Sequence, residues 1–176
     1  RLARHLLTLA PGTPVLATTA TANQRVTADV ARQLGAHTVT FRGSLARRSL
    51  QLAVVPGLGP LERWAWVADA LDTFPGSGIV YTLTVAEAER LAGFLASLGH
   101  PVAAYTGRLD ADARVQIEEQ LRRNELRAVV ATSALGMGYD KPDLAFCIHA
   151  GSPSSPVAYY QQVGRAGRAI DHASVV

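Results

Sequence analysis

The sequence predicts an α/β fold built around a mainly parallel sheet, and three observations support this prediction. Short runs of β-branched residues alternate with longer amphipathic stretches, which is the element order of parallel α/β folds. Hydrophobic residues make up 48% of the chain and charged residues 18%, so a packed core is expected rather than disorder. The length of 176 residues accommodates one domain of ordinary size and part of a second.

Composition also excludes several classes of protein. No apolar run approaches the roughly 18 residues that cross a membrane, and Pro11, Gly12 and Pro14 interrupt the N-terminal stretch, so we expect neither a membrane partner nor a signal peptide. Cys147 is the only cysteine, which excludes an internal disulfide framework and a cysteine zinc cluster, and we expect no metal ligands. The net charge of +3 is too small to indicate nucleic-acid binding by itself.

The first part of the chain predicts one helix between two short strands. Apolar residues recur at helical spacing from Asn23 to Leu34, and Gly35 then ends the helix. We expect the strands at residues 15–17 and 39–41. A basic segment without periodicity follows, and this segment is the expected linker.

The rest of the chain carries a longer α/β series. We expect its strands at 52–55, 79–81, 102–105, 128–131 and 145–148. The expected helices begin at Pro60, Val85, Asp110 and Pro156, and Gly99 caps the second of them. The first helix has an apolar stripe of Leu61, Trp64, Ala68 and Leu71, and the third has the i,i+4 pairs Glu118–Arg122 and Glu119–Arg123.

Two arginines near the C-terminus have the properties of phosphate ligands. Arg165 and Arg168 are three residues apart, which places them on one face of a helix, and each follows a glycine that lets another surface approach. A guanidinium group binds phosphate oxygens in a planar, bidentate way, and it stabilises the charge that develops during phosphoryl transfer. The alternative interpretation is two solvated arginines at the end of a surface helix.

A glycine-rich segment after the expected strand 128–131 is a second candidate for phosphate binding. Thr132 and Ser133 supply hydroxyl groups, and the loop through Gly136 and Gly138 supplies backbone N–H groups. The alternative interpretation is an ordinary strand-to-loop turn in which the glycines serve only the backbone conformation.

These segments resemble the helicases of superfamily two, and the RecQ helicases in particular. Residues 161–168 are similar to motif VI, and residues 131–142, with Gly-Met-Gly before Lys-Pro, resemble motif V as RecQ proteins have it. Residues 77–82 resemble motif IV, and residues 104–107 resemble the next block of the family. Residues 16–23 resemble motif III. The resemblance runs from Val15 to Arg168 in the family's order.

The resemblance implies a RecA-like fold of the P-loop NTPase type, in which helices flank a parallel sheet. Residues 1–42 would be the C-terminal end of a first RecA-like lobe, and 43–51 the linker. Residues 52–170 would be the second lobe, and 171–176 an unpatterned tail.

The resemblance also implies a role for each matching residue. Arg168 would be the arginine finger, supported by Arg165, and the ATP contacts would be Gln161, Gly138 and Asp140. The nucleic-acid contacts would be Thr82, Thr106, Gly107, Thr132 and Ser133. Thr106 stands where RecQ proteins usually have His, and the rings of Tyr81 and Tyr105 are expected in the core. Thr19 and Thr21 would couple the ATP state to the second lobe, or alternatively cap the helix after Asn23.

The implied activity is that of an ATP-dependent 3′–5′ DNA helicase in DNA repair or recombination, in the bacterial cytoplasm at the nucleoid. The sequence contains neither a G-x-x-x-x-G-K-[ST] loop nor a D-E-x-H box, so most ATP contacts and the Mg²⁺ ligands are expected in a first lobe outside this chain. We therefore expect the chain alone to be inactive. The alternatives are an RNA helicase, a non-catalytic nucleic-acid-binding or partner-binding lobe, and a dinucleotide-binding oxidoreductase, although no G-x-G-x-x-G follows a first strand.

Overall fold

The computed structural model describes residues 13–19, 22–43, 46–133, 135 and 139–176. The chain divides into two compact units, Arg1–Arg47 and Arg48–Val176. The boundary between them falls within the segment 43–51 expected as a linker.

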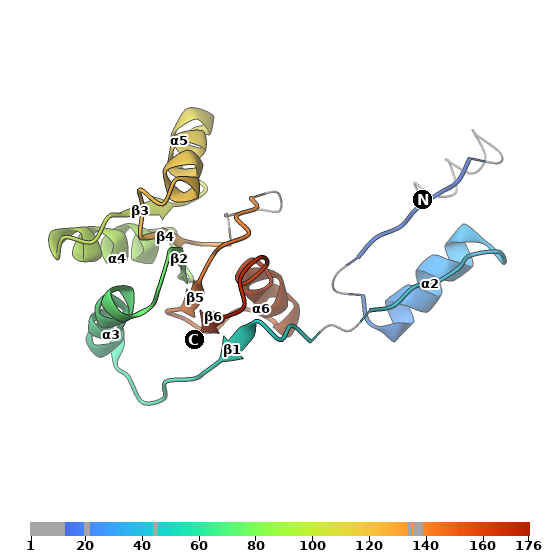
Figure 1. Cartoon of the computed structure of the whole chain (residues 1–176), viewed down its shortest axis with the longest axis horizontal. Helices are drawn as coiled ribbons and strands as arrows, with labels where there is room; N and C mark the ends of the chain where they lie inside the picture. The colour runs from blue at the N-terminus through green and yellow to red at the C-terminus, as the bar shows by residue number, and fades with distance from the viewer. Residues whose placement is uncertain (1–12, 20–21, 44–45, 134, 136–138) are drawn as a thin grey trace. The chain divides into compact units, whose positions relative to one another are not determined.

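The second unit contains a parallel sheet of six strands (Figure 1). Its strands are β1 (Leu50–Leu52), β2 (Gly78–Tyr81), β3 (Val102–Tyr105), β4 (Ala128–Ala131), β5 (Phe146–His149) and β6 (Ala173–Val175). Their order across the sheet is β1-β6-β5-β2-β4-β3, and every neighbouring pair is parallel. The predicted α/β class with a mainly parallel sheet is therefore confirmed.

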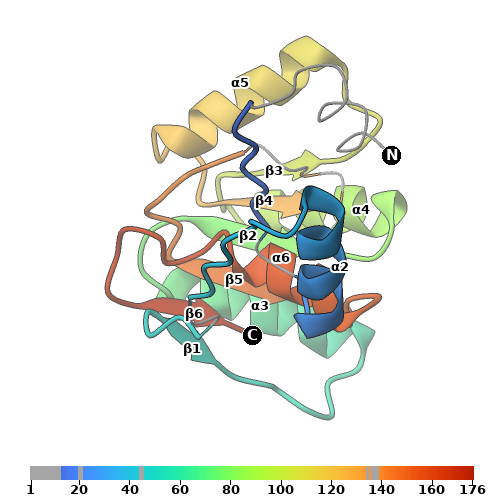
Figure 2. The ribbon, with the colours of Figure 1, turned by 90° about the vertical axis from the view of Figure 1, so that its right-hand side faces the viewer.

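Helices cover both faces of this sheet. The helices are α3 (Pro60–Thr73), α4 (Val85–Ser97), α5 (Ala111–Arg122) and α6 (Pro156–Val163). One core joins α3 and α4 to β2, β4 and β5, and the core on the opposite face includes Leu121 of α5 and Val163 of α6. Figure 1 shows α3 and α4 on one side of the sheet, and Figure 2 looks onto the side that α6 covers.

The end of the chain corrects the prediction of an unpatterned tail. Residues 173–175 form β6, which pairs with β1 on one side and with β5 on the other. Ala173 and Val175 are buried, and Ser174 between them is partly exposed, so burial alternates along the strand. Three residues are too few for an alternating pattern to be recognised, and both neighbouring strands are distant in sequence. The strand expected at 52–55 is instead Leu50–Leu52, so it begins inside the expected linker and residues 53–55 lie outside it.

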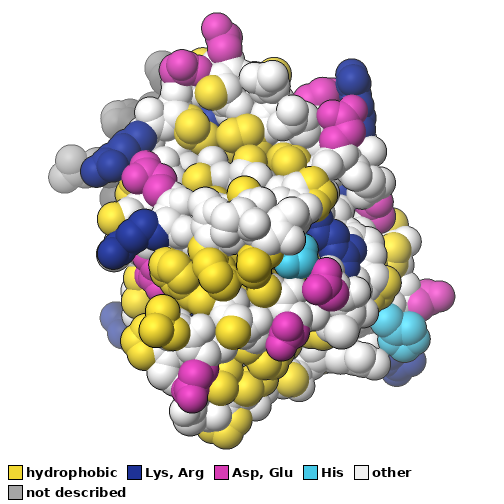
Figure 3. Space-filling view, turned by 90° about the vertical axis from the view of Figure 1, so that its left-hand side faces the viewer, with side chains coloured by type: hydrophobic (Ala, Val, Ile, Leu, Met, Phe, Trp, Pro, Cys, Tyr) yellow, Lys and Arg dark blue, Asp and Glu magenta, His cyan; other side chains and the backbone are white. Residues whose placement is uncertain are grey.

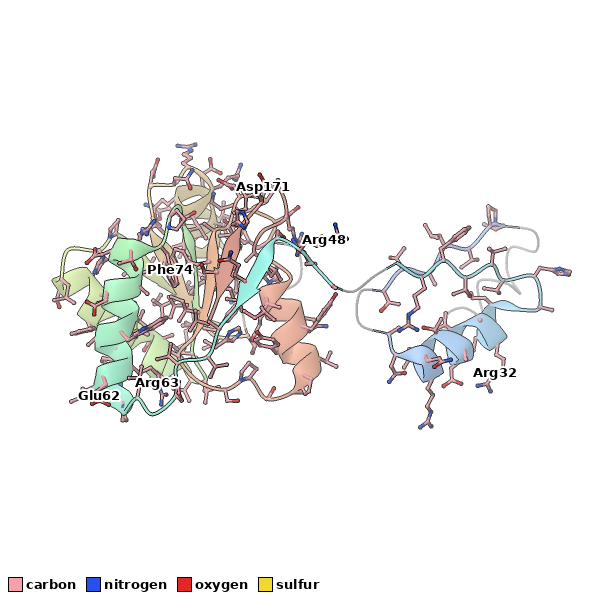
Figure 4. The ribbon with its side chains drawn as sticks, turned by 60° about the horizontal axis from the view of Figure 1, so that its bottom comes forward. Arg32, Arg48, Glu62, Arg63, Phe74 and Asp171 are labelled. Carbon is pink, nitrogen blue, oxygen red and sulfur yellow. The ribbon has the colours of Figure 1, made fainter. Side chains whose placement is uncertain are left out.

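Helix α3 begins where Pro60 predicted it, but its buried face is different. Leu61, expected in the core, is 80% exposed, whereas Val67 and Ala70 are buried beside the predicted Ala68 and Leu71. The first turn of α3 is fixed by Glu62, whose carboxylate accepts a hydrogen bond from the Gly59 N–H at 2.7 Å. Figure 4 shows Glu62 and Arg63 at this end of the helix and Phe74 at the other.

The next two helices begin at the residues expected from the sequence, and the first of them also ends where it was expected to end. Thr84 caps α4 by accepting from the Glu87 N–H, and Gly99 follows the helix with a φ of 91°. Asp110 caps α5 in the same way. Of the predicted ion pairs on α5, Glu119–Arg123 is confirmed and Glu118–Arg122 is wrong: Glu119 binds both arginines, because Glu118 turns inward to Tyr105.

Some apolar side chains of these helices remain at the surface. Figure 3 shows hydrophobic side chains on the face that α3 and α4 cover, among charged ones. Leu61 and Leu98 are 80% and 55% exposed, and Trp64 packs against Phe94 with ring centroids 5.7 Å apart. None of the described helices is long and apolar enough to cross a membrane.

The first unit contains one described helix, α2 (Gln24–Leu34). Asn23 caps it by accepting from the Val26 N–H, and Gly35 ends it with a φ of 113°, so this predicted helix is confirmed. The helix cap is thus Asn23 itself and not Thr19. The strands expected at 15–17 and 39–41 are wrong: neither segment has regular structure, because neither is paired with another strand.

We predict that Gly78→Ala destabilises the second unit by about 1–3 kcal/mol, as overpacking of a core does. A Cβ at Gly78 would lie 2.2 Å from the Phe146 ring, on the neighbouring strand. Gly93→Ala is the matched control, because a Cβ there meets nothing within 4 Å and a helical alanine stabilises by roughly 0.5–1 kcal/mol. Urea unfolding of the two variants measures the difference. Equal stabilities would contradict the close contact with Phe146.

Candidate nucleotide and nucleic-acid site

Three threonines follow three adjacent strands at the carboxyl edge of the sheet. Thr82, Thr106 and Thr132 come directly after β2, β3 and β4, which lie side by side in the order β2-β4-β3. The Thr82 N–H donates to the carbonyl of Ala131, the last residue of β4, at 2.9 Å, which continues the pairing of β2 with β4 past the end of β2. The fold therefore brings together these predicted nucleic-acid contacts, at the edge where parallel α/β sheets bind ligands.

The threonine side chains themselves are buried. Thr82, Thr106 and Thr132 are 5%, 2% and 8% exposed, whereas Ser133 is exposed. The Thr82 hydroxyl donates to the carbonyl of Thr84 at 3.3 Å, and the Thr106 hydroxyl accepts from the Arg108 N–H at 3.4 Å. These two hydroxyls thus shape the turns after their strands. The groups that this edge offers to a ligand are chiefly backbone groups and Ser133.

Arginines hold and flank the turn after β3. Arg114, on α5, donates from Nη2 to the carbonyl of Gly107 at 3.0 Å. Arg108 follows Gly107, is mostly exposed, and pairs with Glu89 of α4 at 3.5 Å. Sequence reasoning did not single out Arg108, although a basic residue directly after a strand-end glycine is a signal for a phosphate contact.

Tyr81 and Tyr105, which end β2 and β3, pack in the core as predicted. The Tyr105 hydroxyl donates to Glu118 of α5 at 2.5 Å. Burial, and then this hydrogen bond to a carboxylate, raise the pKa of Tyr105 to about 12. The rings are therefore structural, and Tyr105 joins the end of β3 to α5.

The two arginines after α6 do not lie on a helical face, which corrects the prediction. The helix ends at Val163, Gly164 caps it, and residues 164–170 form turns and bends. Gly167 has a φ of 64°, which favours glycine, and a Cβ there would lie 3.0 Å from the side chains of Ala173 and Ser49. Gly167 thus does more than leave room for a ligand: its backbone conformation lets the chain turn after the helix.

The loop 139–144 holds this arginine-bearing segment by main-chain hydrogen bonds. The Gly167 N–H donates to the carbonyl of Leu144 at 2.9 Å, and the Ala169 N–H donates to the carbonyl of Pro142 at 2.8 Å. The same loop carries Asp140. The structure thus brings together the ends of the two glycine-containing segments that the sequence singled out.

Both arginine side chains reach the loop 139–144. Arg168 donates from Nη1 to Asp140 Oδ1 at 2.8 Å and from Nε to the carbonyl of Gly164 at 3.0 Å, and its side chain is 42% exposed. Arg165 is partly buried and donates from Nη1 to the carbonyl of Tyr139 at 3.0 Å. An exposed pair such as Arg168–Asp140 contributes little to stability, so both groups remain available to a ligand.

Arg165 interacts with Tyr81, the first of three aromatic side chains that contact one another at the ends of β2 and β5 and on α6. Burial raises the pKa of Tyr81 above its usual range, and the positive charge of Arg165 acts in the opposite direction. His149 stacks on Tyr81 with ring centroids 5.4 Å apart, and it contacts Tyr159 on its other side. Burial lowers the pKa of His149, which favours its neutral form.

Of the two adjacent glutamines on α6, Gln162, which the sequence did not predict as a site residue, contacts His149. Gln162 Oε1 lies 3.1 Å from His149 Nε2, whereas the predicted Gln161 is exposed. The signal for Gln162 was its place three residues before Arg165, on the buried side of the same turn.

Two predicted site residues, Gly138 and Thr21, lie outside the described residues, as does Gly136. Thr19 is exposed and belongs to the first unit. Within the described part of the chain, no group of three His, Cys, Asp or Glu side chains is arranged to hold a metal ion.

Residues 63–170 match the family described as the helicase conserved C-terminal domain. The chain belongs to this family. The matched range of this helicase C-terminal domain includes the threonine edge, the loop 139–144 and both arginines.

The resemblance to RecQ helicases is also confirmed by similar proteins. ATP-dependent DNA helicase Q-like 4B of Arabidopsis thaliana is 37% identical over 159 residues, which are 90% of this chain and 14% of that protein. The probable ATP-dependent DNA helicase RecS of Bacillus subtilis (strain 168) is 37% identical over 157 residues, which are 88% of this chain and 32% of that protein. The chain with this helicase C-terminal domain therefore spans a third or less of either relative.

Solved structures confirm the RecA-like fold of the helicase C-terminal domain. S. cerevisiae Dbp5 bound to RNA and ADP BeF3 matches with a TM-score of 0.75 and 21% identity, over 99% of this chain and 47% of that one. The Mycobacterium smegmatis helicase Lhr bound to ssDNA and AMP-PNP matches with a TM-score of 0.61 and 26% identity, over 72% of this chain and 19% of that one. At 21% identity, the likeness to Dbp5 shows the fold alone.

We predict that Tyr105→Phe changes the alkaline stability of the helicase C-terminal domain. The pKa of Tyr105 is about 12 in the folded protein, whereas an unfolded tyrosine ionises near about 10. The stability that this hydroxyl contributes is therefore fully present below about pH 10 and is lost as the pH rises through the folded value. The free energy of unfolding in urea should fall less steeply from pH 10 to pH 12 in the variant, and it should be lower by about 1 kcal/mol at pH 8. Identical slopes would contradict the role of the Tyr105–Glu118 hydrogen bond.

Proposed function

We propose that this chain is the second RecA-like motor lobe, with the C-terminal end of the first, of an ATP-dependent 3′–5′ DNA helicase. The observation that carries the proposal is the placement of Arg168. Its guanidinium is partly exposed beside Asp140, on a segment whose backbone is fixed by the loop 139–144. An arginine held in this way is ready to bind a phosphate that another lobe presents.

The residues present suit the triphosphate of a nucleotide. The two hydrogen bonds of Arg168 to described residues use Nε and one N–H of Nη1, which leaves the second N–H of Nη1 and both N–H groups of Nη2 for phosphate oxygens. Arg165 would support Arg168 and share the charge of the γ-phosphate. Asp140 would accept from the ribose hydroxyls, and Gln161 and Gly138 would complete the nucleotide contacts.

Nucleotide hydrolysis supplies the free energy for movement, and this chain would contribute charge stabilisation and a grip on DNA. Arg168 would stabilise the negative charge that develops on the transferring phosphoryl group. Mg²⁺ ligands would lie in the first lobe, because the sequence of this chain contains no D-E-x-H box. Thr19 and Thr21 would transmit the nucleotide state between the lobes.

The carboxyl edge of the sheet would hold the phosphates of one DNA strand. The turns at Thr82, Thr106–Gly107 and Thr132–Ser133 offer backbone N–H groups and the Ser133 hydroxyl along one line of adjacent strand ends. Contacts of this kind read the phosphate backbone and not the bases, so binding would be independent of sequence and strongly dependent on salt.

The exposure of the first unit supports its assignment to a larger lobe. No described residue of 13–43 is buried, and Leu16 and Phe41 are 87% and 93% exposed. Apolar side chains this exposed in a folded segment indicate a surface that further chain covers. We propose that residues 1–42 pack on the remainder of the first lobe.

The choice of DNA over RNA rests on the relatives. The proteins at 37% identity are named DNA helicases, whereas S. cerevisiae Dbp5, bound to RNA, shares only 21% of its residues with this chain. A role in DNA repair or recombination, at the bacterial nucleoid, is part of the same proposal. An RNA helicase and a non-catalytic lobe are the alternatives.

We predict that Arg168→Ala lowers the DNA-stimulated ATP turnover of the full-length protein by about 10³-fold, as loss of an arginine finger does. Arg90→Ala is the matched control. Arg90 is also exposed and also donates from Nε to the carbonyl four residues earlier, but it lies on α4. Steady-state ATPase assays should leave the control unchanged. Near-normal turnover of Arg168→Ala would refute the finger, and an inactive wild-type protein would favour the non-catalytic alternative.

We predict that the full-length protein unwinds a DNA duplex with a 3′ single-stranded tail and not the RNA duplex of the same sequence. Strand separation, followed by fluorescence, measures both substrates under the same conditions. Raising the salt concentration should weaken DNA binding steeply, because phosphate contacts release counterions. Preferential unwinding of the RNA duplex would establish the alternative.

A further inference from the structure

We propose that Lys141 is a positioning residue for the two arginines. It would hold the loop 139–144 against the amino edge of the sheet, and so fix the positions of Arg168 and Arg165. The inference rests on the proposed function, because it concerns the residue that would act as the arginine finger. The Lys141 side chain donates to Asp143 and not to either arginine. Lys141 would therefore act on the positions of the arginines through the loop 139–144.

The burial of Lys141 is the first observation. The residue is 2% exposed and is among the largest fully buried side chains of the described chain. Its Nζ lies 2.6 Å from Asp143 Oδ1, and the Asp143 side chain is half exposed. Lysine is almost never buried without a partner, because an ammonium group loses its hydration there. A lysine that only served solubility or a surface charge would point outward.

The partner of Lys141 is itself anchored near the amino edge of the sheet. The Asn124 side chain lies near enough to Asp143 to help lower the pKa of that carboxyl, and its Oδ1 accepts from the Ser77 hydroxyl at 3.1 Å. Ser77 directly precedes β2, and its carbonyl accepts from the Ala145 N–H at 2.8 Å. Hydrogen bonding to Lys141 lowers the pKa of Asp143, which keeps its carboxylate ionised for this cluster. The cluster thus connects the loop to the segments before β2 and β4.

The other end of the same loop meets the arginines. Tyr139 accepts from Arg165, and Asp140 accepts from Arg168. The carbonyls of Pro142 and Leu144 accept from the backbone of residues 169 and 167. Lys141 lies between these contacts, and its own carbonyl accepts from the Leu144 N–H at 3.3 Å to close the turn. Displacement of Lys141 would therefore shift all four contacts together.

The test is a pair of substitutions in the full-length protein. Lys141→Met keeps the length and apolar stem of the side chain and removes Nζ. We expect kcat of the DNA-stimulated ATPase to fall about 10- to 100-fold, as misplacement of a catalytic group does, with KM for ATP changed by less than about threefold. In the Arg168→Ala background the same substitution should cost less than about twofold more, because residues that act as one unit are not additive.

Arg127→Met is the control for simple loss of stability. Arg127 is a cation that is partly buried, and it binds the carbonyls of Leu71 and Phe74 on the α3 side of the sheet. This control should lower the melting temperature and leave kcat unchanged below it. Lys141→Met should lower kcat even where its melting temperature matches that of the control.

A second variant keeps the test decisive if Lys141→Met does not fold. Asn124 has a φ of 60°, which glycine adopts without strain, so Asn124→Gly removes the side chain that accepts from Ser77 and lies near Asp143, and it preserves the backbone. It should lower kcat in the same direction and lose that effect in the Arg168→Ala background. Equal losses in both backgrounds, or an unchanged kcat, would overturn the role of Lys141. Full activity of Arg168→Ala alone would instead refute the proposed finger.

Discussion

Two main-chain hydrogen bonds between residues 142–144 and 167–169 are the constraint on which the candidate site depends. A helix that continued past Val163 would use the N–H groups of Gly167 and Ala169 within itself. Because the helix stops, these groups bind the carbonyls of Leu144 and Pro142 instead. The loop and the arginine-bearing segment thereby hold one another, although neither has regular structure. Side chains on these two segments are therefore held in position although neither segment is helical.

The sheet imposes a different constraint at its carboxyl edge. Parallel strands end together, so residues that follow β2, β3 and β4 become neighbours regardless of their distance in sequence. The threonines at these positions turn their side chains inward, whereas Ser133 faces outward. A surface made mainly of backbone groups suits a polymer whose repeating feature is its phosphate. The same edge would be poorly suited to reading individual bases.

Periodicity identified the central elements because burial there repeats along the chain. The strands at 79–81, 102–105 and 128–131 and the caps at Gly35, Asp110 and Gly99 followed from local sequence alone. The strand at the C-terminus, the inward turn of Glu118 and the exposure of Leu61 did not. Each of these depends on a partner far away in sequence, which no local pattern reports. The motifs singled out the two arginines, but the backbone conformation of these residues follows from contacts with the loop 139–144.

The position of β1 has a consequence for how the second unit is made. Within the described sheet, β1 pairs only with β6. The strand of the second unit that is synthesised first therefore pairs with the strand of the described sheet that is synthesised last. Strands β2, β3, β4 and β5 can pair with one another before β6 is available, and residues 50–52 remain unpaired until then. Such long-range pairing is slow to form, and here it joins residues 50–52 to residues 173–175. Pairing of β1 therefore has to follow the synthesis of β6.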